Sequence, residues 1–292
     1  MKKLKHIYLD FSSIDLYRSC PRKFYLQLVE TFIPKGTTDE STEATFKGRM
    51  IHEALDAKAM GRSPRDAMMK LVKDSSIKHI HTIDPDKSGS VHHMRKLLAA
   101  YLKRYKNDNL QIVSTEARFE YPLTPWCTYV GNVDKVARLG NKTVIVDHKT
   151  SSSLKSWVEP QVSISDQFTG YIALAKHNGI VTDTLVVDGV STALKALKDG
   201  DGLFVRYNTV RTKDQILDWE TRMKWWATRI KEDLETNKWN TNQPKACTSY
   251  GGRCSFFDIC AGAGLSGINI LRNDFMKNPK PWHSFKIVWE DQ

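Results

Sequence analysis

The chain has no stretch of 18 consecutive apolar residues among its 292 positions, so we expect no transmembrane helix. Its basic start, residues 1–13, has neither the apolar segment nor the small-residue cleavage site of a signal peptide, which favours a cytoplasmic location. Internal repeats and low-complexity tracts are also missing. The length therefore suits one large domain without a membrane-spanning part.

Cysteine is scarce and its count is odd, which argues against a disulfide framework. The five cysteines are Cys20, Cys127, Cys247, Cys254 and Cys260. Three of them fall within 14 residues near the C-terminus. This clustering favours a metal or cluster site, whereas Cys127, on an expected strand, is interpreted as an ordinary buried thiol.

Acidic residues are fewer than basic ones, 33 against 44, which gives a formal net charge of +11. An excess of positive charge favours a polyanionic partner, with nucleic acid first. The alternative is a basic enzyme with no such partner. A hydrophobic fraction of 40% and a charged fraction of 26% are ordinary for a globular protein.

Hydrophobic periodicity predicts helices first, then strands, then a mixture. Helical spacing covers 44–60, 64–73, 89–106, 165–178 and 213–236, and alternation covers 110–123, 127–139, 142–147, 183–190 and 202–210. Ser12 or Ser13 is expected to cap an earlier short helix, and Pro21 to open another. Loops are expected at 31–43 and 74–88, and irregular chain after 236. The order predicts an α/β fold with a mixed sheet and helices on its faces.

Charged residues end the third expected strand, in the segment VIVDHKT. Asp147 and Lys149 share one face of this strand, because side chains alternate with a period of two. A Gly140-Asn141 turn would bring Asp134 of the preceding strand to the same end of the sheet. Two neighbouring carboxylates suit a Mg²⁺ or Mn²⁺ ion, and the lysine can orient a water or stabilise charge on a phosphate. The alternative is a salt bridge at a strand end.

Three short motifs in this region resemble the PD-(D/E)XK nuclease superfamily. They are Gly131-x-x-Asp134, Asp147-x-Lys149-Thr150 and Gln167-x-x-x-Tyr171. More narrowly, they resemble its RecB-type branch, which includes phage exonucleases, helicase-coupled nucleases and CRISPR adaptation nucleases. The resemblance covers roughly residues 10–262. It implies a restriction-endonuclease-like αβββαβ core, with a helical N-terminal elaboration and a C-terminal cysteine segment.

The resemblance also implies roles for single residues. Divalent metal ligands would be His52 in the segment GRMIHEAL, Asp134, Asp147, the backbone carbonyl of His148 and, as an additional carboxylate, Glu116. Lys149 would position the attacking water. Gln167 and Tyr171, one helical turn apart, would line the active site and help to place Lys149 and the DNA. Without the other motifs, His52 would be an ordinary helix histidine, Gln167 and Tyr171 an ordinary helix face, and Glu116 a solvated strand residue.

The cysteines also resemble a pattern in this branch. Iron–sulfur RecB-type nucleases have one cysteine before the nuclease core and three after it, which here would be Cys20, Cys247, Cys254 and Cys260. The resemblance therefore implies a [4Fe–4S] cluster that joins distant segments of the chain. Zinc is the alternative, although neither short spacing is a zinc knuckle. Four unconnected buried thiols are the third interpretation.

The function implied is a Mg²⁺- or Mn²⁺-dependent deoxyribonuclease, an exonuclease on single-stranded DNA or DNA ends in recombination, replication or repair. A phage-encoded enzyme in the host cytoplasm, with recombination or replication proteins as partners, fits only by analogy. Trp157 is a candidate for stacking on a base, or else a core residue. The alternatives are a non-catalytic iron–sulfur DNA-binding subunit and a zinc-stabilised interaction domain. One nuclease domain would contain a helical part at 1–106, the core at 107–211, the long helix and cysteines at 212–262, and a tail at 263–292.

Overall fold

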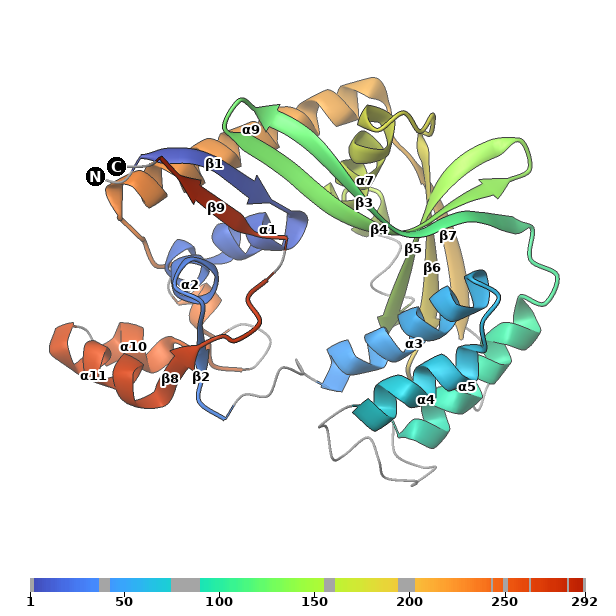
Figure 1. Cartoon of the computed structure of the whole chain (residues 1–292), viewed down its shortest axis with the longest axis horizontal. Helices are drawn as coiled ribbons and strands as arrows, with labels where there is room; N and C mark the ends of the chain where they lie inside the picture. Colours follow the sequence, from blue (N-terminus) through green and yellow to red (C-terminus); the bar gives the residue numbers. More distant parts are fainter. Residues whose placement is uncertain are drawn as a thin grey trace. The chain divides into compact units, whose positions relative to one another are not determined.

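The computed structural model describes most of the chain and divides it into two compact units (Figure 1). The described residues are 3–36, 43–74, 90–154, 161–193, 203–242, 244–248, 252–262, 264–282 and 284–290. Trp157 and most of the loop expected at 74–88 lie outside them. One unit consists of 40–119 and 132–216, and the other of 1–39, 120–131 and 217–292. No helix among the described residues is long and apolar enough to cross a membrane.

A mixed sheet forms the centre of the first unit. The strands are β4 (Cys127–Leu139), β5 (Lys142–Ser151), β6 (Thr184–Ser191) and β7 (Phe204–Val210), in this order across the sheet. The β4–β5 and β6–β7 pairs are antiparallel, and β5 and β6 are parallel. Strand β3 (Leu110–Thr124) also pairs with β4. These pairings confirm the predicted α/β fold with a mixed sheet.

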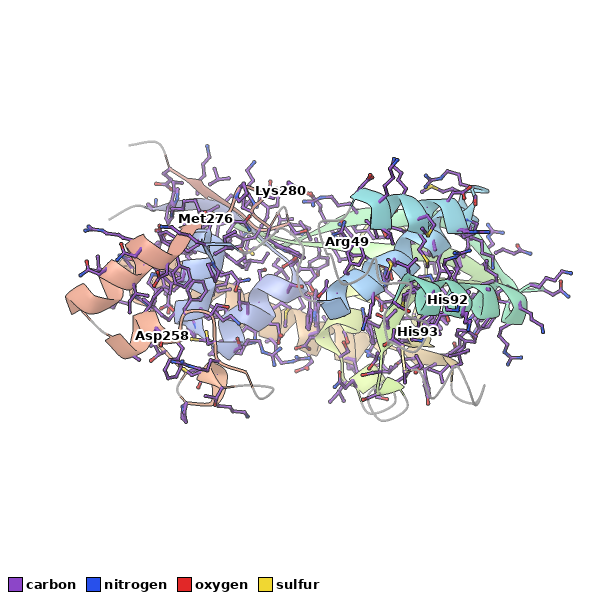
Figure 2. All side chains as sticks on the ribbon, turned by 90° about the horizontal axis from the view of Figure 1, so that it is seen from below. Arg49, His92, His93, Asp258, Met276 and Lys280 are labelled. Carbon is purple, nitrogen blue, oxygen red and sulfur yellow. The ribbon has the colours of Figure 1, made fainter. Side chains whose placement is uncertain are left out.

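Three helices pack together over one face of this sheet. They are α3 (Glu43–Ala59), α4 (Pro64–Asp74) and α5 (Val91–Arg104). Their apolar residues, such as Met50 and Leu97, form one core cluster with Val190 of β6. The Ser90 side chain caps α5 by accepting a hydrogen bond from the amide of His93. The side chains of His92 and His93 extend from the first turn of α5 (Figure 2).

Helix α7 (Asp166–His177) connects the parallel strands β5 and β6, as a parallel pair requires. It contacts both strands and is buried along most of its length. Ser165 caps its first turn, and the buried guanidinium of Arg211 donates to the Thr169 hydroxyl and to the carbonyl of Val162. These bonds fix the helix to the end of β7, and the helix then presents Gln167 and Tyr171.

The second unit is built around the long helix α9 (Lys213–Thr236), whose bounds match the prediction. Trp219 of α9 is fully buried and packs edge-on against Tyr121 and Tyr129 of the sheet. Strand β1 (Leu4–Leu9) pairs in parallel with the first residues of β4 and antiparallel with β9 (Lys286–Trp289). The end of the chain is therefore tied to its beginning by a strand pair.

Several expectations for the second unit were wrong. The sequence after 236 is not irregular, because it contains α10 (Phe257–Gly262), α11 (Gly264–Asp274), β8 (Phe275–Lys277) and β9. Strand β8 pairs with β2 (Phe32–Pro34), inside a segment that was expected to be a loop. These strands of three or four residues are too short for an alternating pattern to reveal them.

The expected helix caps were also wrong in part. Asp10, rather than Ser12 or Ser13, caps α1 (Phe11–Ser19), and Ser13 completes a capping box with it. Pro21 opens α2 (Pro21–Phe24) as expected, and the chain continues as a π-helix over Tyr25–Val29.

The core of helices α3, α4 and α5 gives a stability prediction. We expect Leu97→Ala to lower the free energy of unfolding by about 2–5 kcal/mol, because a fully buried side chain leaves a cavity. The neighbouring Lys96→Ala, on the exposed face of the same helix, is the control and should change it by less than about 0.5 kcal/mol. Urea unfolding followed by circular dichroism measures both, and equal effects would contradict the described core.

Candidate active site

Two aspartates face each other across the β4–β5 hairpin. The last pairs in the register are Lys135 with Val146 and Val136 with Ile145, so Asp134 lies beside Asp147 on the next rung. Gly140 has a φ of +62°, which the tight turn between the strands requires and which glycine adopts without strain. The alternation of side chains puts both aspartates on the sheet face opposite to Lys135 and His148. The predicted convergence of the two carboxylates is therefore present.

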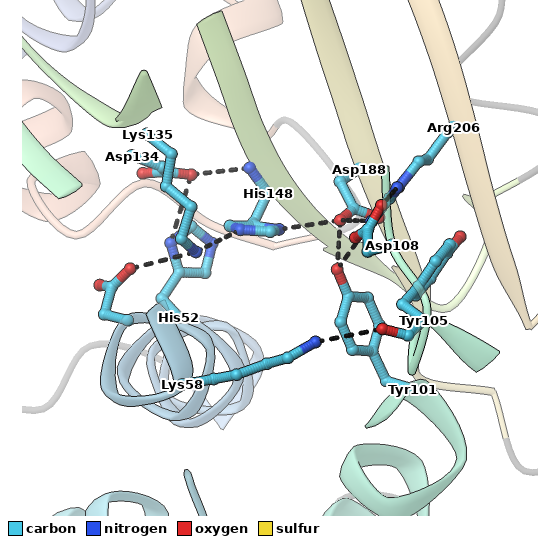
Figure 3. Close-up of polar contacts among 11 residues, drawn as sticks. His52, Lys58, Tyr101, Tyr105, Asp108, Asp134, Lys135, His148, Asp188 and Arg206 are labelled. Atoms are coloured by element: carbon cyan, nitrogen blue, oxygen red, sulfur yellow. Dashed lines mark hydrogen bonds and ion pairs between the residues drawn. The ribbon is translucent and has the colours of Figure 1, made fainter. Parts of the chain in front are cut away.

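Asp134 is held by two groups (Figure 3). The backbone amide of His148 donates a hydrogen bond of 2.7 Å to its Oδ2. Nδ1 of His52 lies 3.5 Å from the same oxygen. His52 reaches it from α3, which approaches β5 so closely that a Cβ on Gly48 would lie 3.2 Å from Oγ1 of Thr150. The small residue in the segment GRMIHEAL thus permits the close approach of the helix.

Asp147 is almost completely buried, with 1% of its surface exposed, and it pairs with Lys149 on the same strand face. Nζ of Lys149 lies 2.7 Å from Oδ2 of Asp147. The lysine is less buried and also lies 5.6 Å from the ring centre of Phe168 on α7. A partly exposed ammonium on a buried carboxylate is free to move toward a charged substrate.

The two aspartates have opposite pKa shifts. Burial, reinforced by the charge of Asp134, raises the pKa of Asp147 to about 6, although Lys149 acts against this. Burial also acts to raise the pKa of Asp134, but the hydrogen bond and charge of His52 outweigh it, so this pKa lies well below its usual 3.8. Burial lowers the pKa of His52, yet Asp134 and Asp147 bring it above 6.5. Asp134 is therefore the carboxylate that ionises first, and its negative charge makes ionisation of Asp147 harder.

Glu116 lies beside this group, on β3. Its φ of +49° is in the left-handed region, which is uncommon for a residue with a side chain and costs about 1–2 kcal/mol. Burial, a hydrogen bond with Asp56 and the negative charges of Asp56 and Asp134 raise the pKa of Glu116 to about 7. The side chain of Glu116 is exposed on the strand, and the charges of Asp56 and Asp134 act on it.

Gln167 and Tyr171 are on the same side of α7, as expected. Nε2 of Gln167 donates a 3.0 Å hydrogen bond to the hydroxyl of Tyr171. Phe168, the residue next to Gln167, brings its ring near the ammonium of Lys149. The helix therefore borders the lysine.

The donor set suits a hard divalent cation, because it offers carboxylate oxygens and one imidazole nitrogen. In the part of the chain that the structure describes, no three His, Cys, Asp or Glu side chains form a preformed metal-binding group. Instead, His52 and Lys149 act as counter-ions of the two carboxylates. A cation that binds here has to displace these ion pairs, at least in part.

Sequence reasoning missed a second set of buried charges behind the site. Nζ of Lys135 lies 2.6 Å from Nε2 of His148 and 3.2 Å from Oδ1 of Asp56. Asp188 of β6 lies 3.5 Å from Nδ1 of His148. Two signals were in the sequence: Lys135 directly follows Asp134, and Asp56 follows His52 by one helical turn. Both read as ordinary charged residues until the structure shows them buried.

The four cysteines that were expected to bind a cluster all belong to the other unit. Cys20 is buried, and Cys247, Cys254 and Cys260 are half-buried. The amide of Cys254 donates a 2.8 Å hydrogen bond to the carbonyl of Cys247. Burial raises the pKa of Cys260, the other three thiols raise it further, and Arg22 acts in the opposite direction. Among the described residues, no three of these thiols form a preformed metal-binding group, whereas Cys127 is fully buried, as expected.

Comparisons with known proteins find similarity in sequence and in fold. The model of the PD-(D/E)XK nuclease superfamily matches residues 9–261. A solved structure from Eubacterium rectale, described as a “putative exonuclease”, is 13% identical, covers 88% of each chain and has a TM-score of 0.53, so it shares the fold. An alkaline exonuclease from Laribacter hongkongensis is 9% identical, covers 66% of this chain and 95% of its own, and has a TM-score of 0.34. Comparison with curated proteins finds no match.

The opposite pKa shifts predict opposite effects of neutralising the two aspartates. Ionised Asp147 destabilises the fold, and this penalty grows as the pH rises from 3.8 through about 6. Asp134 stabilises the fold above pH 3.8, and this contribution is lost as the pH falls below that value. At pH 7.5 with EDTA, we therefore expect Asp147→Asn to raise the free energy of unfolding by about 1–3 kcal/mol and Asp134→Asn to lower it.

Urea unfolding at pH 7.5 and pH 5 measures both variants against the unmodified protein. The gain from Asp147→Asn should shrink at pH 5, where the carboxyl is largely protonated in the folded protein. If both variants lost the same amount of stability, the result would contradict the opposite pKa shifts of Asp134 and Asp147.

Proposed function

The chain belongs to the PD-(D/E)XK nuclease superfamily, and we propose that it is a metal-dependent deoxyribonuclease, an exonuclease on single-stranded DNA or DNA ends. The observation that carries this proposal is the buried pair Asp134 and Asp147 with Lys149 on the same face. A pair of carboxylates in this environment stabilises a divalent cation, and the cation in turn offsets their mutual repulsion. The positive net charge of the chain supports a nucleic-acid substrate.

The proposed metal ligands are His52, Asp134, Asp147 and the backbone carbonyl of His148, with Glu116 as an additional carboxylate. A bound Mg²⁺ or Mn²⁺ supplies positive charge for the scissile phosphate and makes a coordinated water more acidic. With a pKa raised to about 7, the carboxyl group of Glu116 is only partly ionised near neutral pH.

Lys149 has the position of the residue that orients the attacking water. Its ammonium is partly exposed and pairs with Asp147, so it can exchange this contact for one with a water or a phosphate oxygen. Gln167 and Tyr171 support the site from α7, where their hydrogen bond fixes both side chains. A fixed helix face beside Lys149 limits the directions in which the ammonium can point.

The four thiols of Cys20, Cys247, Cys254 and Cys260 are proposed to hold a [4Fe–4S] cluster. Their mutual influence on pKa and the hydrogen bond between Cys254 and the carbonyl of Cys247 support this proposal. A cluster would lower the thiol pKa values, because only thiolates bind iron. It would also join the N-terminal helices to the C-terminal segment. We also propose that residues 1–292 form one nuclease domain. Its proposed role is in recombination, replication or repair of DNA.

The second candidate is a non-catalytic DNA-binding subunit with the same cluster. A non-catalytic subunit would need an active site in which the acidic residues or the lysine are out of position. The ion pair between Lys149 and Asp147 argues against this candidate, because it keeps both groups on the same strand face. The two candidates differ in whether DNA is cut.

We expect Lys149→Met to lower DNA cleavage by about 10²- to 10³-fold, because the ammonium that orients the water is lost. The assay incubates anaerobically prepared protein with end-labelled single- or double-stranded DNA and with Mn²⁺ or Mg²⁺. It measures the rate and the polarity of cleavage together. Lys142→Met is the control, since Lys142 is exposed at the start of the same strand and should leave the rate unchanged. Absence of cleavage by the unmodified protein with any divalent metal would overturn the nuclease proposal.

Iron analysis tests the cluster separately. Protein purified without oxygen should be brown and contain about four iron atoms per chain. Cys254→Ala should lose most of this iron and colour. The control Cys127→Ala removes the fifth cysteine, a buried thiol on a strand, and should keep both. Colourless protein with one bound zinc would contradict the cluster and support the zinc alternative.

A further inference from the structure

Lys135 is a buried lysine on the back of the proposed metal site. Only 2% of its surface is exposed, and its side chain leaves β4 on the sheet face opposite to Asp134. Its ammonium lies 2.6 Å from Nε2 of His148 (Figure 3). It also lies 3.2 Å from Oδ1 of Asp56. A buried charge of this kind is costly unless it is paired and hydrogen-bonded, so both partners are required.

These contacts determine the state of the His148 ring. The ammonium can only donate, so Nε2 of His148 must accept, and the ring is neutral with its proton on Nδ1. This proton faces Asp188, whose Oδ2 lies 3.5 Å away. The imidazole is therefore held by a hydrogen bond to Lys135 on one side and lies 3.5 Å from the carboxylate of Asp188 on the other.

The three contacting residues come from the three elements that carry His52, Asp134 and Asp147. Asp56 follows His52 by one turn of α3, Lys135 follows Asp134 on β4, and His148 follows Asp147 on β5. The contacts Asp56–Lys135–His148 thus join α3, β4 and β5 directly behind the site. No contact of this set uses a side chain that would bind the metal.

The far end of this set is also anchored. Asp188 accepts hydrogen bonds from Tyr101 and Arg206, and Arg206 forms two hydrogen bonds, of 2.7 and 2.8 Å, with Asp108. His148 therefore has Lys135 of β4 on one side and Asp188 of β6 on the other, and Tyr101 of α5 holds Asp188. Its backbone amide, which donates to Asp134, has little freedom to shift.

From this arrangement we infer that Lys135 is a positioning residue, which sets the spacing of His52, Asp134 and Asp147 by binding Asp56 and His148. The inference rests on the proposed function, because it assumes that these three residues bind a divalent metal. It assigns to Lys135 an effect on metal affinity without contact to the metal, the DNA or the attacking water.

The test compares Mn²⁺ binding to anaerobically prepared full-length variants by titration calorimetry without DNA. Lys135→Met removes the ammonium and nearly keeps the length of the side chain, but it leaves Asp56 buried and unpaired. The double variant Lys135→Met with Asp56→Asn removes both charges, so that no buried carboxylate is left unpaired. It replaces the single variant in the test if the single variant does not fold. We expect both to bind Mn²⁺ about 10- to 100-fold more weakly than the unmodified protein. The KM for DNA should stay unchanged, and cleavage should recover in part at high Mn²⁺.

Lys58→Met is the matched control. Lys58 lies on α3, as Asp56 does, but its ammonium donates to the carbonyl of Tyr105 and contacts neither Asp56 nor His148. This variant should bind Mn²⁺ like the unmodified protein. Unchanged Mn²⁺ affinity in the folded double variant overturns the inference and leaves the proposed function intact. If the unmodified protein shows no Mn²⁺ binding that Asp134→Ala removes, the proposed function fails, and the inference fails with it.

Discussion

The structure around the candidate site depends on the burial of two carboxylates on neighbouring antiparallel strands. Asp134 and Asp147 are side by side on one rung, where Asp147 is buried and only 14% of the Asp134 side chain is exposed. Repulsion between them would favour the unfolded chain, so each carboxylate needs a positive or donating partner. The His148 amide and His52 stabilise one charge, and Lys149 stabilises the other. Helix α3 has to approach β5 closely for His52 to reach Asp134, and Gly48 makes this approach possible.

The same requirement continues behind the sheet, where charges of opposite sign alternate from Asp56 through Lys135 to Asp188 and Arg206. His148 is the neutral residue in this row, and it belongs to both layers. Its ring contacts the charges behind the sheet, and its amide holds Asp134 at the front. Buried charged side chains of this kind contribute less to the free energy of unfolding than apolar side chains of similar volume would. Their ion pairs and hydrogen bonds nevertheless allow little displacement of the side chains. We therefore attribute to this row geometric constraint rather than stability.

Sequence reasoning reached the parts that depend on local periodicity. The two-residue repeat of strands was enough to place Asp147 and Lys149 on one face, and the Gly140-Asn141 turn placed Asp134 beside them. The helical repeat gave α9 with its bounds. Strands β1 and β9 were missed because they are short and pair across almost the whole chain length. The roles of Asp56 and Lys135 were missed for another reason: a charged residue looks solvated until the docking of α3 on the sheet shows that it is buried.

The charge balance of the site links metal binding to the fold. With His52 and Lys149 as the counter-ions, Asp147 still has a pKa of about 6, so its ionisation at neutral pH is incompletely compensated. In the proposed metal site, a bound divalent cation would compensate the charges of Asp134 and Asp147 and would weaken the ion pair of Lys149. Binding to the folded chain alone then stabilises the fold. The residue that is released is the one with the most freedom to move toward a phosphate, because its partner is fully buried and it is not. Under the proposed function, charge compensation at Asp147 and release of Lys149 would therefore follow from the same binding event.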